Sequence, residues 1–399
     1  MKQTITWLAL LPWAALSVTA LADEAADARV TKLEQELAEV KARQDASSWT
    51  DRFKVNGFAS VAVGTASNDA GFYGYDEDAE WLPDSVLGLQ MTFNVNEQTE
   101  ATVQLQARGA DDWDPKIEWA FLAYTFDNGT KLRGGKLRLP LYMYSDYLEV
   151  GYAYPFARPS VDVYSLVPFS SYTGVDALIP VAIGDSTLTF QPFVGEASIN
   201  SRGTYVDFKS MLGMVALLEY GNYTLRGIHG IDKLESDPNG PLSILNDIDS
   251  GFTGVAASYD NGDYFIIAEG ARIFNEGAYR DVDSAYLALG YRFDAFTPYL
   301  VVGQSKSTDD DKRDGLAALG LRSSLDIRRT TVAAGLRWDF MPQLALKFDV
   351  TRASGFDGTT GGMASNEGVI NIPGAGPTGI NTATYDDTTI YSIVLDAVF

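Results

Sequence analysis

Basic side chains recur at one kind of position in this sequence, the polar face of segments in which apolar and polar residues alternate. The set comprises Arg108, Arg292, Arg337 and Lys347 and, if their segments run as strands in the same sense, Arg133 and Arg226. Fixed cations gathered along one wall create a local field that attracts anions and repels cations. The alternative is that each cation is paired with a nearby carboxylate, such as Asp339 or Asp349, and is structural.

Residue types that perform acid–base or nucleophilic catalysis are scarce. The sequence has no cysteine and a single histidine, His229, which we expect at the end of a strand beside a loop. The run DDDKRDG, Asp309 to Gly315, resembles a calcium-binding loop, but Lys312 stands where an oxygen ligand is required. We therefore expect no enzymatic activity, no cofactor and no metal centre, and we interpret the run as a solvated acidic loop that binds divalent ions loosely at most.

The segments that would position the basic residues are strands. From Arg52 onward apolar and polar residues alternate with a period of two, and in the last nine residues Tyr391, Ile393, Leu395 and Phe399 share one apolar face. A strand with an apolar outer face and a mixed inner face is typical of a transmembrane barrel. A soluble sandwich shows the same alternation with its apolar face turned inward. Two segments, 117–126 and 263–274, are apolar on both faces, so their orientation stays open.

The connections favour the barrel. Seven very short turns alternate with eight longer polar segments, so that all long loops fall on one side. The short turns are 96–97, 127–129, 184–185, 221–222, 260–262, 294–295 and 341–342, and the longer segments are 67–84, 109–116, 140–171, 197–209, 231–250, 275–282, 305–325 and 353–386. The predicted fold is therefore all-β, a sixteen-stranded antiparallel transmembrane β-barrel. Side chains cannot fill a barrel of that width, which predicts a water-filled channel.

The amino-terminal end has two parts. Residues 1–22 have the features of a secretory signal peptide, with Lys2, an apolar stretch and the small-residue pattern Ala20-Leu21-Ala22. After it, apolar residues recur at coiled-coil spacing, which predicts a short helix that oligomerises. The predicted contact residues are Val30, Leu33, Leu37 and Val40. The alternative is a solitary amphipathic helix lying on the barrel.

The signal peptide, sixteen strands, long third loop and terminal Phe399 resemble the trimeric porins of Gram-negative bacteria. The coiled coil resembles that of the porin subset with a periplasmic amino-terminal coiled coil, the DcaP type. The resemblance implies a homotrimer in the outer membrane, in contact with lipid and lipopolysaccharide. We divide the chain into a signal peptide (1–22), a periplasmic coiled-coil segment and linker (23–48) and the barrel (49–399). The net charge of −23 argues against nucleic acid as a partner.

The third long segment, 140–171, is rich in aromatic residues and proline, and would be costly to expose to water. In porins the third loop folds into the barrel, so the resemblance implies the same here; the alternative is a loop that caps the rim or contacts a neighbouring subunit. Its acidic residues would then oppose the wall cations across a constriction. The predicted pore-lining and selectivity residues are Arg108, Arg133, Lys136, Arg138, Asp146, Glu149, Arg158, Asp162, Arg226, Arg292, Arg337 and Lys347.

Together these features predict a porin that passes small hydrophilic solutes by passive diffusion, with an anion preference that falls as salt rises. One alternative is a substrate-specific channel for small anions such as dicarboxylates or phosphate. An alternative of another class is an outer-membrane adhesin or structural barrel, which would use the acidic loops and the coiled coil for contacts.

Overall fold

The structure is a computed structural model, and it describes residues 29, 31–41, 52–201, 204–240, 243–319, 325–362, 369–372, 376–381 and 385–399. The chain divides into two units, Met1–Lys54 and Val55–Phe399. The first contains a helix over residues 31–41, on which Leu33, Leu37 and Val40 are 61%, 55% and 57% exposed. Val30 and the expected signal peptide lie outside the described residues. Within the described residues, no helix is both long enough and apolar enough to span a membrane.

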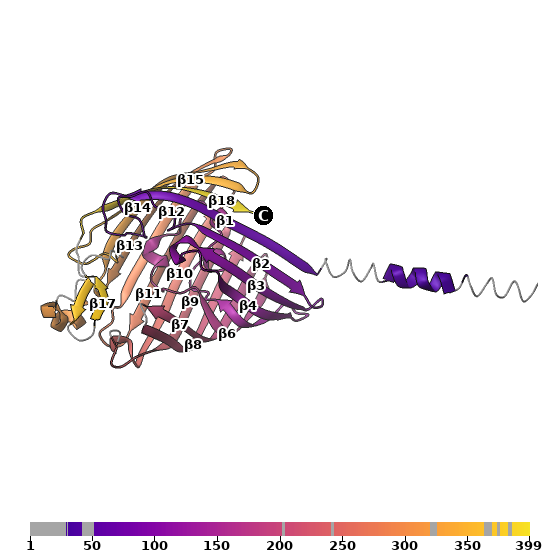
Figure 1. Cartoon of the computed structure of the whole chain (residues 1–399), viewed down its shortest axis with the longest axis horizontal. Coiled ribbons are helices and arrows are strands. Elements are labelled where there is room, and N and C mark those ends of the chain that lie inside the picture. The colour runs from indigo at the N-terminus through magenta and orange to yellow at the C-terminus, as the bar shows by residue number, and fades with distance from the viewer. Residues whose placement is uncertain are drawn as a thin grey trace, which may run out of the picture. The chain divides into compact units, whose positions relative to one another are not determined.

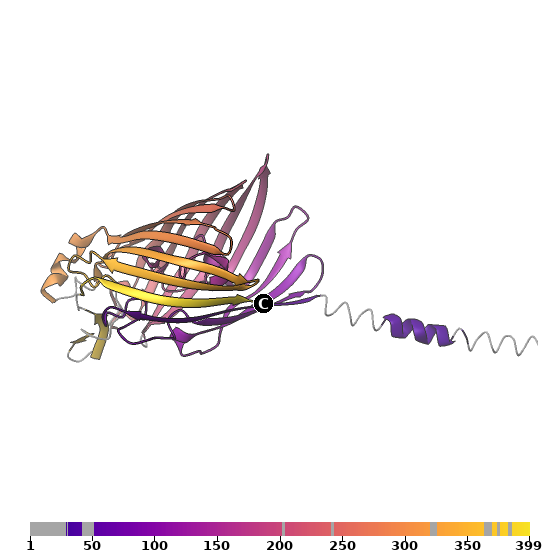
Figure 2. The ribbon, with the colours of Figure 1, turned by 90° about the horizontal axis from the view of Figure 1, so that it is seen from above.

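Sixteen antiparallel strands close into a barrel (Figures 1 and 2). This confirms the predicted fold and strand number. The barrel strands are β1 (Phe53–Ala66), β2 (Val86–Asn94), β3 (Thr99–Arg108), β4 (Lys116–Thr125), β5 (Lys131–Arg138), β6 (Ser171–Ile183), β7 (Ser186–Ser201), β8 (Thr204–Tyr220), β9 (Tyr223–Ser236), β10 (Ile248–Asp260), β11 (Tyr264–Asn275), β12 (Val282–Tyr291), β13 (Phe296–Ser307), β14 (Arg328–Met341), β15 (Leu344–Ser354) and β18 (Thr388–Val398). A separate two-stranded sheet, β16 (Val369–Ile372) and β17 (Gly376–Asn381), lies in the loop before β18.

The last strand closes the barrel against the first. β18 pairs with β15 on one side and with β1 on the other, where Phe58 stands opposite Val398. The main chains of Gly57 and Phe399 exchange hydrogen bonds of 2.6 and 2.9 Å. No sheet edge is left open in a closed barrel, as the interior of a membrane requires.

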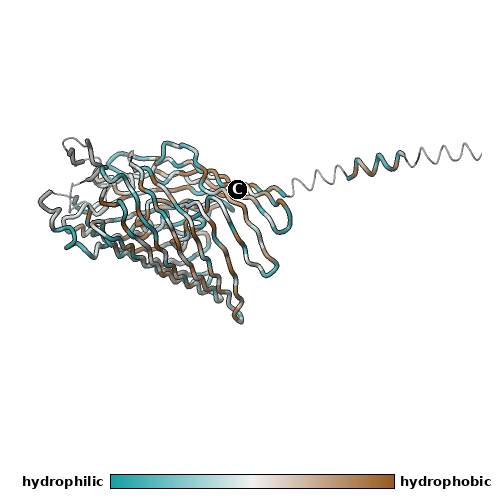
Figure 3. The backbone as a smooth tube through the Cα atoms, turned by 90° about the horizontal axis from the view of Figure 1, so that it is seen from below, coloured by the Kyte–Doolittle hydropathy of each residue, from teal (hydrophilic) through white to brown (hydrophobic). Residues whose placement is uncertain are grey.

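The outer face of the barrel is apolar. On β18, Tyr391, Ile393 and Leu395 are exposed, whereas the alternate residues Ser392, Val394 and Asp396 are buried. Figure 3 shows hydrophobic residues along the strands and hydrophilic ones at the hairpin turns. Exposed aromatic side chains gather at the end with short turns; they include Tyr220, Tyr223, Tyr264, Tyr291, Phe293 and Trp338. An apolar outer band bordered by aromatic residues is typical of a transmembrane barrel.

All seven predicted short turns connect consecutive strands, but the expected long loop at 197–209 is wrong. β7 and β8 continue their pairing through this segment, with Ala197 opposite Phe208 and Ile199 opposite Val206. The pairing register shifts between Gly195 and Ala197. Such an irregularity reverses which residues face outward, so the segment loses the regular alternation that marks a strand.

The structure also orients the two strands that were apolar on both faces. In β4 the register shifts so that Gln104 pairs with Trp119 and Leu105 with Ile117, which leaves Glu118 as an inserted inward residue. In β11, Phe265, Ile267 and Ala271 face inward and are buried. Their partners are aromatic residues inside the barrel. An inward apolar face on a barrel strand therefore marks the wall against which another element packs.

Candidate functional site

The segment between β5 and β6, residues 139–170, folds into the barrel, and we call it the inner loop. It contains the short helix α2 (Val161–Tyr164), which contacts β11, β12, β13 and β14. Its aromatic side chains form one buried cluster with wall residues: the Tyr142 ring lies 5.5 Å from that of Phe252, and the Phe156 ring lies 6.0 Å from that of Tyr299, centroid to centroid. The predicted inward fold of this loop is therefore correct.

Two predicted selectivity cations hold the inner loop near the end with short turns. Lys347 donates from Nζ to the carbonyl oxygens of Gly151 at 2.7 Å and Phe156 at 2.8 Å, and pairs with Asp396 at 2.8 Å. Lys347 is 0% exposed. Buried and fully bonded in this way, it contacts the loop rather than the water in the lumen. Lys347 is therefore a structural cation, the alternative that the sequence left open for the wall cations.

Arg337, next to Lys347 on the neighbouring strand, has the same role. Its Nη1 donates to the carbonyl oxygens of Tyr152 at 2.7 Å and Tyr154 at 3.0 Å, and its guanidinium pairs with Asp339. Arg337 is 9% exposed. Main-chain carbonyl groups of an irregular loop need donors when they are buried, and these two cations supply them.

Two charged residues of the inner loop also form buried ion pairs, with strands of the wall and with the loop after β1. Arg158 pairs with Asp84 and with Asp349, at 2.6 and 3.0 Å. Asp162 accepts a hydrogen bond of 2.9 Å from Arg329. The sequence had suggested that Arg158 and Asp162 line the pore. Both are instead buried in ion pairs, so neither is a free charge that faces the lumen.

The structure adds an anchor that sequence reasoning missed. Glu269, on the inner face of β11, accepts hydrogen bonds from the Met143 main-chain N at 2.9 Å, Tyr164 Oη at 3.0 Å and Tyr286 Oη at 3.2 Å. A carboxylate among the inward apolar residues of this strand was the signal that could have identified it. Because a buried carboxylate needs donors, its position indicates that polar groups of another element reach that wall.

Three more predicted residues form ion pairs on the β3–β6 wall. Arg133 binds Asp176 with both arms of its guanidinium, at 2.8 and 2.5 Å. Arg138 pairs with Glu118 at 2.9 Å. Arg108 pairs with Glu149 of the inner loop. The three pairs are these: Arg133–Asp176, Arg138–Glu118 and Arg108–Glu149.

Lys136 does not face the lumen, which corrects its predicted position. It stands opposite Ala120 and Thr173, on the face that carries the exposed Leu122 and Val175. Its Nζ donates to the carbonyl oxygen of Ile117 at 2.5 Å. Since consecutive side chains of a strand alternate between faces, Lys136 and Arg133 cannot both point inward.

Three cavities border one another inside the barrel. The lower cavity, of about 560 Å³, lies between the inner loop and the short-turn ends of β6–β12. A middle cavity, of about 150 Å³, is lined by Arg108, Arg138 and Glu149. The outer cavity, of about 270 Å³, lies on the long-loop side of the inner loop. Tyr142 and Ser145 line both the lower and the middle cavity, and Leu139, Leu141, Val167, Pro168 and Phe169 line both the middle and the outer cavity.

The lower cavity contains the least compensated of the predicted charges. Arg226 donates to the carbonyl oxygens of Leu141, at 2.8 Å, and Pro140, and it forms no ion pair with any residue that the structure describes. Asp146, on the inner loop, lines the same cavity and is exposed. Arg292 also lines it, but Asp260 binds its guanidinium at two positions of 2.7 Å each. Arg226 and Asp146 thus present opposite charges to one cavity, which Glu219 also lines.

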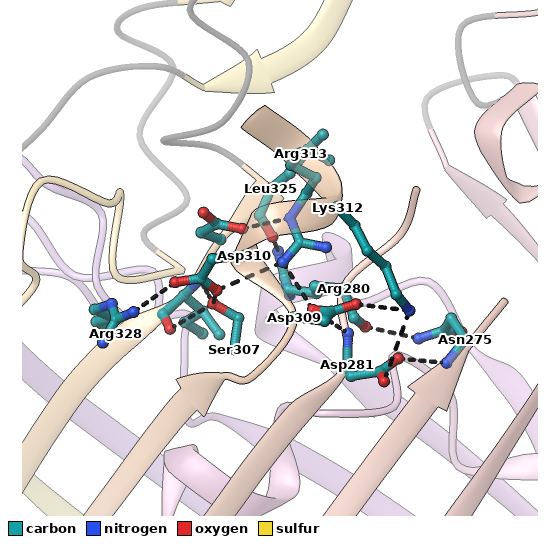
Figure 4. Close-up of polar contacts among 12 residues, drawn as sticks. Asn275, Arg280, Asp281, Ser307, Asp309, Asp310, Lys312, Arg313, Leu325 and Arg328 are labelled. Carbon is teal, nitrogen blue, oxygen red and sulfur yellow. Dashed lines mark hydrogen bonds and ion pairs between the residues drawn. The ribbon is translucent and has the colours of Figure 1, made fainter. Parts of the chain in front are cut away.

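The acidic run at 309–315 is an ordered ionic cluster rather than a solvated loop (Figure 4). Arg313 pairs with Asp309 at 2.8 Å and with Asp310 at 3.5 Å, and Lys312 reaches Asp309 at 3.1 Å. Arg328 on β14 pairs with Asp310 at 2.5 Å. In the parts of the chain that the structure describes, no group of three or more acidic, histidine or cysteine side chains is arranged to hold a metal ion.

His229 lies within β9, not at its end as expected. It is exposed on the outer face, with Nδ1 2.9 Å from Thr253 Oγ1, and its ring stacks against Phe274. It is therefore separated from the three cavities by the strand itself.

Comparison with known proteins identifies the fold. No protein-family model matches the chain, and neither does any curated protein. Among solved structures it is similar to an anion-selective porin from Comamonas acidovorans (14% identity, 87% of this chain and 99% of that chain, TM-score 0.58). It is also similar to the outer-membrane channel DcaP of Acinetobacter baumannii (12%, 87% and 97%, TM-score 0.56) and to a loop L8 deletion mutant of OmpT, an outer-membrane protein of Vibrio cholerae (12%, 87% and 100%, TM-score 0.55). The chain has the sixteen-stranded barrel fold of the outer-membrane porins.

Proposed function

We propose that this protein is an outer-membrane porin, a channel through which small hydrophilic solutes diffuse passively. The observation that carries the proposal is the inner loop: it is fixed against one wall and leaves three bordering cavities along the other. The apolar outer face and its aromatic border support a position in the outer membrane. The names of the structural neighbours, two of them porins or channels by description, support the same assignment.

We further propose that charge selectivity is weak and originates in the lower cavity. Of the predicted lumen cations, seven are paired with carboxylates, namely Arg108, Arg133, Arg138, Arg158, Arg292, Arg337 and Lys347. Paired charges largely cancel at the distance of a passing ion. The field of Arg226 remains, opposed by those of Asp146 and Glu219, which line the same cavity without an ion pair to a described residue. Such a field orients dipolar solutes and confines any anion preference to the surroundings of Arg226.

The proposed assembly is a homotrimer with the amino-terminal helix in the periplasm. Three exposed apolar residues on the 31–41 helix, Leu33, Leu37 and Val40, need a partner to leave water. A helix of this length is marginal by itself, so association with the same helix of other copies would stabilise it.

Planar-bilayer recording of the purified protein tests the proposed function. A porin gives stepwise increases of ionic current as single channels insert, with conductance nearly independent of voltage polarity. A correctly folded barrel that inserts and gives no current steps would contradict the proposal and would favour an adhesin or structural barrel.

A further inference from the structure

The outer cavity differs in chemistry from the rest of the lumen. Its floor is the inner loop, with Leu139, Leu141 and Phe169, and its walls carry Phe208 and Phe252. Phe169 and Phe208 are in contact, with ring centroids 4.5 Å apart. An apolar surface of this kind is unfavourable along a path meant only for hydrated ions, because it holds water poorly.

One acidic group faces this apolar cavity. Asp232, on the inner face of β9, lines it and accepts a hydrogen bond at Oδ1 from Ser250. Its Oδ2 accepts no hydrogen bond from any residue in the described part of the chain. The described residues that line the cavity include neither lysine nor arginine. The carboxylate therefore lacks a cation in an environment that screens its charge less than bulk water does.

We propose that the outer cavity is a binding site for a small aromatic amine in its protonated form. The ring would replace water against Phe208, Phe252 and the loop leucines, and the ammonium group would donate to Asp232 Oδ2. The volume of about 270 Å³ suits one substituted ring, since a cavity of roughly 150 Å³ accommodates benzene. An aromatic carboxylate would meet the uncompensated charge of Asp232 and be rejected.

The location gives such a site a role in uptake. The cavity is lined near the long-loop ends of β9, β10 and β11, by Leu234, Ser250 and Asn275, so solutes that enter from the long-loop side meet it before the lower cavity. A weak site at the entrance raises the local concentration of its ligand, whereas a tight one blocks the passage. The inference rests on the proposed channel only for its electrical test.

Four solutes of matched size or charge separate the contributions of ring and charge. Channels in planar bilayers are exposed on each side in turn to 2-phenylethylammonium, ethylammonium, 2-phenylethanol and 3-phenylpropionate, and the residence time of current blocks is measured. We expect the longest blocks with 2-phenylethylammonium added on the long-loop side, shorter ones with 2-phenylethanol, and none with the other two. Equal blocks by ethylammonium and 2-phenylethylammonium would overturn the proposal.

Substitution of the carboxylate locates the site. Asp232→Asn should shorten the 2-phenylethylammonium blocks by about tenfold, the effect of losing a hydrogen bond to a charged group. The matched control is Asp249→Asn, which removes an exposed carboxylate from β10 outside the cavity and should leave the blocks unchanged. Unchanged blocks in folded Asp232→Asn would refute the assignment. If that variant does not fold, the four-solute series on the natural channel still decides.

Calorimetric titration of the detergent-solubilised protein with the same four solutes distinguishes the two proposals. Binding in the same order without any bilayer current would support the site and contradict the channel. Current steps without ring-dependent binding would support the channel and contradict the site.

Discussion

Arg158 on the inner loop and Asp349 on β15 form a buried ion pair, with Nη1 3.0 Å from Oδ1, although 191 positions separate them in the chain. The same guanidinium binds Asp84 and Ser392, so one loop residue connects the loop after β1 with strands β15 and β18. The inner loop is therefore part of the barrel wall on that side, and its opposite side is what solutes meet.

Replacing this anchor should loosen the loop. We expect Arg158→Ala to cost about 3–5 kcal/mol of stability, because it leaves Asp349 and Asp84 buried without a cation. The variant should unfold at a lower temperature in heat-modifiability gels and show a noisier open-channel current. Arg352→Ala is the control, since its ion pair with Asp387 is exposed. Equal behaviour of the two variants would contradict the anchoring role.

Charge selectivity should depend on residues that line the lower cavity without an ion pair to a described residue, among them Arg226 and Asp146. Arg226→Ala is expected to shift the reversal potential in a salt gradient toward cation preference, and Asp146→Asn toward anion preference, with both shifts shrinking as salt rises. Lys347→Met, at a buried cation, should lower stability and leave the reversal potential nearly unchanged. A larger shift in Lys347→Met than in Arg226→Ala would show that the paired cations set the field.

The size of the pore should depend on the inner loop. Replacing residues 144–164 with a short Gly-Ser linker removes α2 and the Phe156 contacts, and we expect a larger single-channel conductance. The control is a variant with the β16–β17 hairpin shortened, which leaves the inner loop intact. If the folded deletion variant conducts no better than the natural channel, the inner loop does not limit the current.

Acid should loosen the outer ionic cluster. Burial would raise the pKa of Asp309, but hydrogen bonds from Arg313 and Lys312 outweigh it and hold that pKa below the ordinary 3.8. Burial would also raise the pKa of Asp310, but hydrogen bonds from Ser307 and Arg328 outweigh that effect and lower this pKa as well. These carboxylates thus contribute stability that is complete above the ordinary value and is lost as the pH falls through the lowered one. Hydrogen exchange of segment 308–315, corrected for intrinsic rates, should be slow at pH 5 and accelerate only below about pH 4. Acceleration already near pH 6 would contradict this.

Deleting residues 24–46 should leave the barrel folded and weaken the oligomer. The reason is that Leu33, Leu37 and Val40 are exposed on the 31–41 helix and would be buried by association with the same helix of other copies. Resistance of the assembly to dissociation in detergent, measured against the full chain, checks the prediction. A monomeric 24–46 peptide together with an equally resistant truncated protein would exclude the coiled coil.

Much of the fold followed from local pattern, because strand alternation and turn length are properties of neighbouring residues. Tyr391, Ile393 and Leu395 could be assigned to the lipid face, and the short turns could be located, without knowing what any strand pairs with. The prediction of a loop at 197–209 was wrong because it also relied on local pattern. The register shift after Gly195 disturbs the local period without ending the strand.

The roles of the inward charges were decided by tertiary structure alone. Alternation placed Lys347 and Arg226 on the same inner face, and nothing in either segment distinguishes them. The path of the inner loop distinguishes the two residues. The loop covers Lys347, which donates hydrogen bonds to Gly151 and Phe156, and it leaves Arg226 at the edge of the lower cavity. The sequence therefore determined which residues face inward, whereas long-range packing determined which of them meet water, because burial and ion pairing depend on groups brought together from distant parts of the chain.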